Sequence, residues 1–367
     1  MKFSCSREEL FNKLNIVTKA ISSRSALPIL QCVLVTAYQN GVILTATDLE
    51  LGMESSKISA NVSAEGSIAL ENKMLLEIVR KFSGETVIIE TDKTFGAEIK
   101  CGFSKFKIMG LDGDEYPALP SVSKDSFIEI SKDSFKEAVK KTIFSVSQDP
   151  SKQVLTGELM EIQGKSLKVV SVDGFRISCF ITNSNGNKDC SIIVPAKTMN
   201  EVSRILSSDE EDENMRIYIT ENHVLFELDE VTVISRLISG TYINYETSFP
   251  PEFKTQLTVK KEDLILSLER AMLISRDSRK SPVVLTIDDG ILKISSSNET
   301  GRSMEDLEIS SVGDKLEIAF NPRYLLEPVK VIDDEYVTLK FNSPLSPCII
   351  VGSEGQDCKY LALPLRM

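Results

Sequence analysis

The residue pair of this chain best suited to chemistry is Asp173 and Arg176, which flank a glycine in the turn-like segment 173–176. A carboxylate, a glycine turn and a guanidinium could serve an enzyme that acts on a metal or phosphate substrate. The equivalent positions elsewhere in the chain are also polar, at Asp48 and Asn298. A repeated polar turn favours a structural explanation, because Asp and Asn side chains hydrogen-bond nearby backbone amides. The arginine could still line a groove.

Other reactive patterns are sparse. The single histidine, His223, lies in a strand-like stretch without a catalytic motif around it. The acidic run 208–213 lacks ligand spacing and indicates a solvated loop, and 112–115 lacks the length of a calcium loop. Neither a phosphate-binding glycine motif nor a serine-nucleophile elbow occurs. We therefore expect a chain without catalytic residues, metal or cofactor.

The bulk composition bounds the remaining possibilities. A length of 367 residues predicts two or three domains, and 42% hydrophobic residues suffice for sizeable cores. The N-terminus lacks an apolar signal segment, and apolar runs are too short for a membrane span. The seven cysteines are scattered without a C-x-x-C pair, which is typical of reduced thiols in a cytoplasmic protein. The net charge of -12 argues against DNA binding unless positive charge gathers on one surface.

Three patterns recur in the same order at intervals close to 125 residues, which indicates a threefold repeat. The first is a short strand followed by a helix start, at 3–10, 128–135 and 257–264. The second is a helix that follows a strand and begins near Lys73, Lys197 and Arg323, with proline at its first position in two cases. The third is a strand, at 44–48, 169–173 and 294–298. The alternative is a chance succession of strand–helix pairs.

The repeat predicts three similar domains, at 1–123, 124–250 and 251–367. Each contains two helices and several alternating segments, which favours an α+β fold of antiparallel sheets covered by helices on one side. The six expected helices contain seventeen basic and ten acidic residues. Their net charge is therefore +7, and that of the rest of the chain is -19. A helical layer facing a polyanion would need this asymmetry, although Lys and Arg are also ordinary helix formers on solvated faces.

Several segments together resemble the bacterial DNA polymerase III beta subunit, the sliding clamp family, over the full length. They are 1–3, 24–30, 47–50, 173–176, 320–324 and 363–367. The resemblance implies a non-catalytic processivity factor, built as a head-to-tail homodimer whose six domains form a ring around duplex DNA. It implies DNA contact without sequence specificity, and partners that include a clamp loader, the polymerase alpha subunit and other proteins with a clamp-binding motif. It also implies a cytoplasmic protein that associates with the nucleoid during replication.

The resemblance also assigns site residues. The side chains that it places toward DNA are Arg24, Lys73, Gln148, Lys152 and Lys197. It places Phe106 and Ile108 of the first domain against Leu273 and Ile274 of the third domain of a second copy. The alternatives are solvated lysines and arginines in the first set, and ordinary core residues in the second.

An apolar groove between the second and third domains would bind a short partner peptide. Its residues would be Leu155, Val172, Gly174, Phe175, Arg176, Ile177, Ile243, Thr247, Asn321, Tyr324, Leu345, Leu363, Pro364, Leu365, Arg366 and Met367. The chain departs from the usual family pattern at Phe175, Ile243, Thr247 and Arg279. The sequence therefore leaves the partner preference of the groove open.

Two other classes remain as alternatives. An enzyme that uses Asp173 and Arg176 would bind a ligand and lose activity on Asp173→Ala. A β-rich structural or adhesive repeat protein would be secreted, for which the N-terminus carries no signal.

Overall fold

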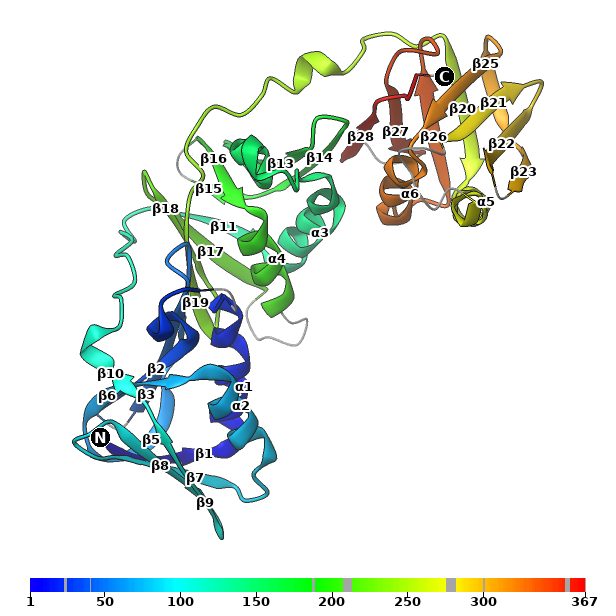
Figure 1. Cartoon of the computed structure of the whole chain (residues 1–367). Coiled ribbons are helices and arrows are strands. Elements are labelled where there is room, and N and C mark those ends of the chain that lie inside the picture. The colour runs from blue at the N-terminus through cyan, green and yellow to red at the C-terminus, as the bar shows by residue number, and fades with distance from the viewer. Residues whose placement is uncertain are drawn as a thin grey trace. The chain divides into compact units, whose positions relative to one another are not determined.

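The computed structural model describes the chain except for residues 23–24, 40, 187–188, 207–212, 275–281, 300, 354–356 and 367. Its backbone contacts separate two compact units: unit 1 contains 1–133 and 201–237, and unit 2 contains 134–200 and 238–367. The described residues contain six α-helices: α1 Arg7–Val17, α2 Asn72–Lys81, α3 Lys132–Thr142, α4 Ala196–Ile205, α5 Lys261–Ile274 and α6 Pro322–Val331 (Figure 1).

All six helices occur where the repeat predicts them. Two of the helices begin at side-chain caps: Ser6 accepts a hydrogen bond from the Glu9 amide at 3.4 Å, and Asn321 accepts one from the Arg323 amide at 3.1 Å. The predicted start of α4 is wrong by one residue, because Pro195 ends a strand and pairs with Gly157. That strand lies at the end of its sheet, where proline is tolerated.

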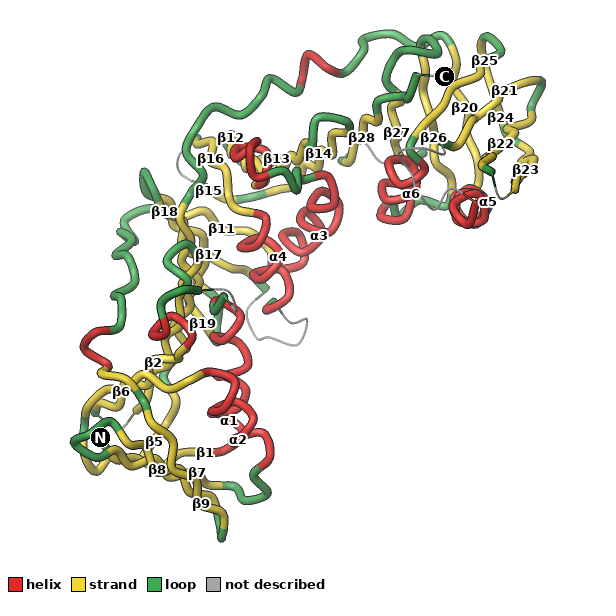
Figure 2. The backbone as a smooth tube through the Cα atoms, in the orientation of Figure 1, coloured by secondary structure: helices red, strands yellow, loops and turns green. Residues whose placement is uncertain are grey.

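Unit 1 consists of antiparallel strands with α1 and α2 packed against each other beside them (Figure 2). The described strands of this unit pair in the order β11-β17-β18-β19-β4-β3-β5-β1-β7-β8-β9, and β2, β6 and β10 extend a branch from β3. Their bounds are β1 Lys2–Ser6, β2 Cys32–Tyr38, β3 Gly41–Thr47, β4 Leu51–Ser55, β5 Ile58–Ala64, β6 Gly66–Glu71, β7 Thr86–Thr91, β8 Gly96–Cys101, β9 Ser104–Met109, β10 Leu111–Asp112, β11 Phe127–Ser131, β17 Asn214–Ile219, β18 His223–Glu227 and β19 Val231–Arg236.

Unit 2 contains two antiparallel sheets among its described residues. One has the order β16-β12-β13-β14-β28-β27-β26-β20-β24 and the other β23-β22-β21-β25, and α5 and α6 pack against each other beside them. Their bounds are β12 Gly157–Gln163, β13 Ser166–Val172, β14 Arg176–Asn183, β16 Cys190–Pro195, β20 Thr255–Lys260, β21 Val283–Asp288, β22 Ile291–Asn298, β23 Gly301–Glu308, β24 Ser310–Gly313, β25 Leu316–Phe320, β26 Tyr336–Phe341, β27 Cys348–Gly352 and β28 Cys358–Ala362, with a short β15 at Asn185–Gly186. The prediction of an α+β fold with antiparallel sheets is confirmed.

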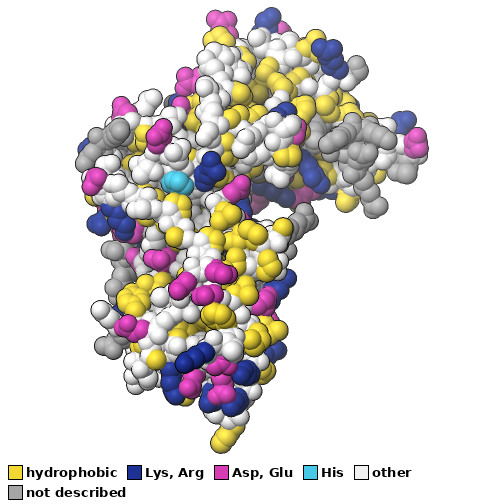
Figure 3. Space-filling view, turned by 60° about the vertical axis from the view of Figure 1, so that its left-hand side comes forward, with side chains coloured by type: hydrophobic (Ala, Val, Ile, Leu, Met, Phe, Trp, Pro, Cys, Tyr) yellow, Lys and Arg dark blue, Asp and Glu magenta, His cyan; other side chains and the backbone are white. Residues whose placement is uncertain are grey.

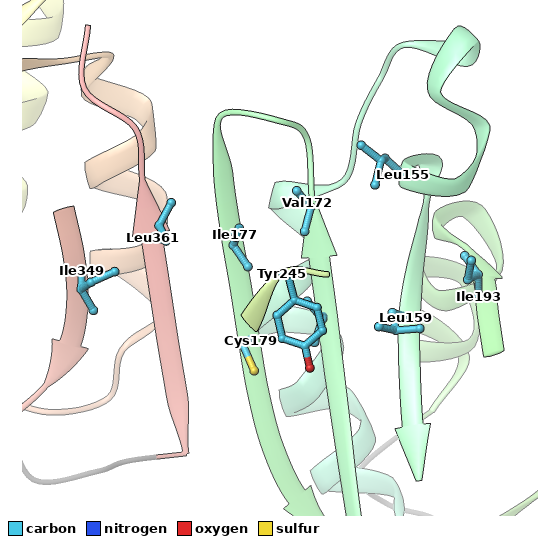
Figure 4. Packing of buried hydrophobic residues seen from close by; sticks show 10 residues of the cluster. Leu155, Leu159, Val172, Ile177, Cys179, Ile193, Tyr245, Ile349 and Leu361 are labelled. Atoms are coloured by element: carbon cyan, nitrogen blue, oxygen red, sulfur yellow. The ribbon is translucent and has the colours of Figure 1, made fainter. Parts of the chain in front are cut away.

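One face of the first of these sheets carries an apolar cluster that continues from β12 to β27. It includes Leu159, Val172, Ile177 and Leu361, and Tyr245 covers them from a connecting segment (Figure 4). Burial of such side chains is worth about 1.5–3 kcal/mol each, so this cluster is a main source of stability in unit 2.

Two further sequence interpretations can be compared with the structure. All seven cysteines are free, and six of them are buried, as expected of small core residues. Residues 113–115 form a single 3-10 turn, capped by Asp112, which accepts a hydrogen bond from the Asp114 amide at 3.0 Å. The acidic run 208–213 falls almost wholly outside the described residues. No described helix is long and apolar enough to cross a membrane.

Candidate functional site

The turn at 173–176 is built by its own carboxylate. Asp173 Oδ1 accepts hydrogen bonds from the amides of Phe175 at 2.8 Å and Arg176 at 3.0 Å. Asp48 binds the amides of two following residues in the same way, and Asn298 Oδ1 accepts from the Gly301 amide at 3.0 Å. The recurring polar residue is thus explained by turn geometry, as the structural interpretation required.

Arg176 joins this turn to α6. Its Nε donates to Asp173 Oδ2 at 2.9 Å, and its other nitrogens donate to the Glu327 carboxylate and to the Phe144 carbonyl oxygen. The guanidinium also lies over the Tyr324 ring, 4.9 Å from its centroid. With only 12% of its side chain exposed, Arg176 is held on every donor-bearing edge, and it holds Tyr324 and the turn together.

Phe175 and Tyr324 form an aromatic pair beside Arg176. Their rings are nearly parallel, with centroids 6.2 Å apart, and more than half of Phe175 is exposed. Its carbonyl oxygen accepts a hydrogen bond from the Leu363 amide at 2.8 Å, so the C-terminal segment lies against the turn. Lys152 Nζ lies 5.8 Å from the Phe175 centroid. Lys152, which the resemblance assigns to DNA contact, therefore lies beside a residue of the predicted groove.

The remaining residues predicted to form the groove are partly buried and partly exposed. Leu155, Val172 and Ile177 are buried in the cluster of Figure 4. The exposed or half-exposed members are Ile243, Thr247, Leu345, Leu363, Pro364, Leu365 and Arg366. Asn321 caps α6, one turn before Tyr324. The Leu365 amide donates a backbone hydrogen bond of 2.7 Å to the Ala319 carbonyl. Met367 lies outside the described residues. An apolar floor with a few polar anchors suits a short extended peptide.

Glu327 and Phe144 are parts of this site that the sequence analysis missed. Glu327 follows Tyr324 by three positions on α6, so the two side chains share one helix face. That spacing was a usable signal. Phe144 contributes a backbone carbonyl oxygen, and the sequence contains no signal that predicts this contact.

Gly174 supports the turn through its backbone conformation. Its φ is +95°, and a Cβ at this position would lie 3.2 Å from Lys152 Nζ. We expect Gly174→Ala to lower the free energy of unfolding by about 1–2 kcal/mol, because left-handed backbone is unfavourable for residues with a Cβ. Leu49 stands at the equivalent position with φ 77°, so Leu49→Gly provides the opposite change. Urea denaturation of both variants checks the pair, and equal destabilisation would contradict a backbone origin.

Comparison with known proteins covers the whole chain. Residues 1–120, 129–244 and 246–366 match the N-terminal, central and C-terminal domain models of the DNA polymerase III beta subunit. The chain belongs to this family. It is 31% identical to the "Beta sliding clamp" of Halalkalibacterium halodurans and 32% identical to that of Staphylococcus aureus strain Mu50, over 100% of this chain and at least 99% of each relative. The family is that of a processivity factor rather than a catalytic enzyme.

Solved structures agree with this membership. A putative DNA polymerase III beta subunit from Eubacterium rectale matches at a TM-score of 0.95 with 37% identity, and the sliding clamp of Bacillus subtilis matches at 0.95 with 30% identity. Each covers 100% of this chain and 99% of the matched chain. The family models divide the sequence into three parts, whereas the contacts of the structure divide it into two units. The boundaries 1–123, 124–250 and 251–367 stay predictions.

The structure describes four of the five residues assigned to DNA contact. Lys73 and Lys197 are exposed near the beginnings of α2 and α4, in different units. Gln148 and Lys152 are exposed on the segment between α3 and β12. Arg24 lies outside the described residues. Exposed positions near helix starts allow phosphate contact, and the assignment stays a prediction.

The four residues assigned to the dimer interface lie at two separate places. Phe106 and Ile108 are on β9, which within the described residues pairs only with β8. Phe106 is 44% exposed, and its ring meets Phe82 edge-on at 5.8 Å. Leu273 and Ile274 end the described part of α5, and Leu273 is 70% exposed. Phe106 and Leu273 are therefore not ordinary core residues within one chain.

Proposed function

We propose that this chain encircles duplex DNA as a head-to-tail homodimer and tethers replication proteins to it through the groove around Phe175. The observation that carries this proposal is a repeated strand pair. β4 and β14 begin at Leu51 and Arg176, 125 positions apart, and each pairs with a strand of the following repeat, β19 and β28. β19 and β28 begin 127 positions apart, at Val231 and Cys358.

The same spacing predicts a third strand pair, which is not formed within the described part of the chain. β23 begins at Gly301, 125 positions after β14, and β9 begins at Ser104, 127 positions before β19. Within the described residues each of these two strands is at the end of its sheet. If β23 pairs with β9 of a second copy, the third junction repeats the other two, and the reciprocal pair closes the assembly. An exposed edge strand needs such a partner or a cover.

The charges of the two edges are complementary. β9 contains Lys105 and Lys107 and no acidic residue, whereas β23 contains Glu305, Asp306 and Glu308 against one arginine. Near the lower end of Figure 3, basic and acidic side chains lie close together above a hydrophobic tip. Phe103, in the turn between β8 and β9, is fully exposed. Opposite charges on facing edges favour association in one register and one orientation.

Function then follows from closure rather than from bond chemistry. A closed ring leaves a long duplex only by opening or by sliding off an end, so its few basic contacts need not bind phosphate tightly. Opening would require a separate clamp loader that uses ATP. The groove would bind the alpha subunit of the polymerase and other proteins with a clamp-binding motif. We place this activity in the bacterial cytoplasm, on the nucleoid during replication.

The test is retention on DNA after loading with a cognate loader and ATP. We expect the protein to stay on nicked circular DNA and to be lost within minutes when the same DNA is linearised. Leu273→Asp should abolish retention on circles by charging the interface, whereas Leu266→Asp, half-exposed on the same helix, should leave it intact. Equal retention on circular and linear DNA would mean ordinary adhesive binding and would overturn encirclement.

A further inference from the structure

The segment 238–253, which we call the strap, crosses one face of the sheet that contains β13, β28 and β26. Three of its aromatic side chains, spaced four residues apart, each lie under a lysine of a different strand. The distances from Nζ to the ring centroid are 5.7 Å for Lys168 and Tyr245, 4.2 Å for Lys359 and Phe249, and 5.7 Å for Lys340 and Phe253. The strap is thus contacted in the same manner along its length.

Hydrogen bonds fix the first end of the strap more tightly than the second. The Ile238 amide donates to Ile193 on β16 at 2.9 Å. Tyr245 donates its hydroxyl proton to Glu161 at 2.6 Å, and Lys168 donates to Glu246 at 2.9 Å. From Phe249 to Phe253, the Phe249 amide donates only within the strap, to the Glu246 carbonyl, and the two rings meet the sheet through the lysine contacts and apolar packing. The next anchor to the sheet is the Lys254 amide, which donates to the Phe341 carbonyl at 2.9 Å. The aromatic contacts therefore matter most in this second half.

Lys359 is the least expected member of the set. Its side chain is half-buried, and burial with a further contribution from the neighbouring Lys340 lowers the pKa of its ammonium group. None of the ion pairs among the described residues involves Lys359. The ring of Phe249, 4.2 Å away, offers the negative face of a π-system to this ammonium group. This contact offsets the cost of desolvating the Lys359 ammonium group, and so explains how a cation is accommodated at a half-buried position.

The strap also contains Ile243 and Thr247, two residues of the proposed groove. We infer that the lysine–aromatic contacts fix the strap on the sheet and thereby position this wall of the groove, with Lys359 and Phe249 as positioning residues. This inference rests on the proposed peptide groove for its functional consequence. The fixed strap itself does not depend on that proposal.

The experiment uses the full-length chain and compares Lys359→Met, which keeps the aliphatic stem, with Lys359→Arg, which keeps the cation. Amide hydrogen exchange is followed at Ser248 and Phe249, whose amides donate to Tyr245 and Glu246 carbonyls. Binding is measured by fluorescence anisotropy with a synthetic apolar pentapeptide that ends in Leu-Phe. Lys315→Met, an exposed lysine elsewhere in unit 2, is the matched control.

We expect Lys359→Met to speed exchange at both amides and to weaken peptide binding, each by roughly fivefold, while Lys359→Arg stays near wild type. In a Phe249→Leu background, Lys359→Met should have little further effect. Unchanged amide exchange in Lys359→Met would contradict a role of the ring contact in fixing the strap. So would effects of Lys359→Met and Phe249→Leu on exchange that add up in the double variant. If wild type binds no peptide while exchange responds as expected, the proposed groove fails and the strap stands. Faster exchange with unchanged peptide binding would show that the strap does not position the groove.

Discussion

Arg176→Met is expected to lower the free energy of unfolding by about 3–5 kcal/mol, because it removes the cation from a site that contains two carboxylates. Asp173 and Glu327 both contact this guanidinium, and Asp173 is only 15% exposed. The Phe144 carbonyl also loses its donor. Methionine replaces the aliphatic stem, so most of the loss should come from uncompensated charge and lost hydrogen bonds rather than from packing. Urea denaturation at neutral pH measures the difference.

The chain provides a matched control on α2. Arg80 pairs with Glu77 at 2.5 Å, and about half of each side chain is exposed. Arg80→Met should therefore cost less than about 0.5 kcal/mol, since water solvates both charges when the pair is removed. A loss at Arg176 no larger than that at Arg80 would mean that the network around Tyr324 contributes little to stability. It would also weaken the view that Arg176 holds the turn against α6.

The fold could be predicted to the level of its repeat, because the repeat is written in local patterns. Strand alternation, proline at helix starts and the spacing near 125 residues are all patterns of short stretches or fixed intervals. The polar residues at 48, 173 and 298 were interpreted as turns for the same local reason, and their amide hydrogen bonds agree. The start of α4 was missed because Pro195 suits a helix start and a sheet edge equally well.

The site could be predicted only through resemblance, because its contacts join distant segments. The link from Arg176 to Glu327 spans 151 positions, and no periodicity within either segment indicates it. The lysines of β13, β28 and β26 also contact a distant segment, the strap. Their alternation along the strands alone predicts solvated side chains. The edges β9 and β23 became informative only when the pairs of β4 and β14 were known.

Glu158→Gln is expected to have its largest effect above pH 8. Glu158 lies on β12 and is fully buried; its Oε1 accepts a hydrogen bond from Thr142 Oγ1 at 2.5 Å, while Oε2 has no hydrogen-bond partner among the described residues. Burial raises the pKa of this carboxyl group from 4.5 to about 8, and the Thr142 hydrogen bond opposes the rise only in part. The folded chain therefore retains a proton that the unfolded chain has released.

Between pH 4.5 and 8 this proton difference makes stability fall as pH rises, by about 1.4 kcal/mol per pH unit. The full contribution is present below pH 4.5 and is lost by pH 8, which sets an upper value of about 5 kcal/mol.

Glutamine has the same shape and no charge, so Glu158→Gln should unfold at similar urea concentration to wild type at pH 5 and at clearly higher concentration at pH 8.5. Glu252→Gln, at an exposed carboxylate, should follow the wild-type curve throughout. Because carboxylates whose pKa is lowered by ion pairing, such as Asp333 beside Lys141, titrate alike in wild type and variant, they cancel in the difference. Parallel curves for wild type and Glu158→Gln from pH 5 to 8.5 would show that the buried carboxyl is ionised in the folded chain and that its second oxygen is satisfied.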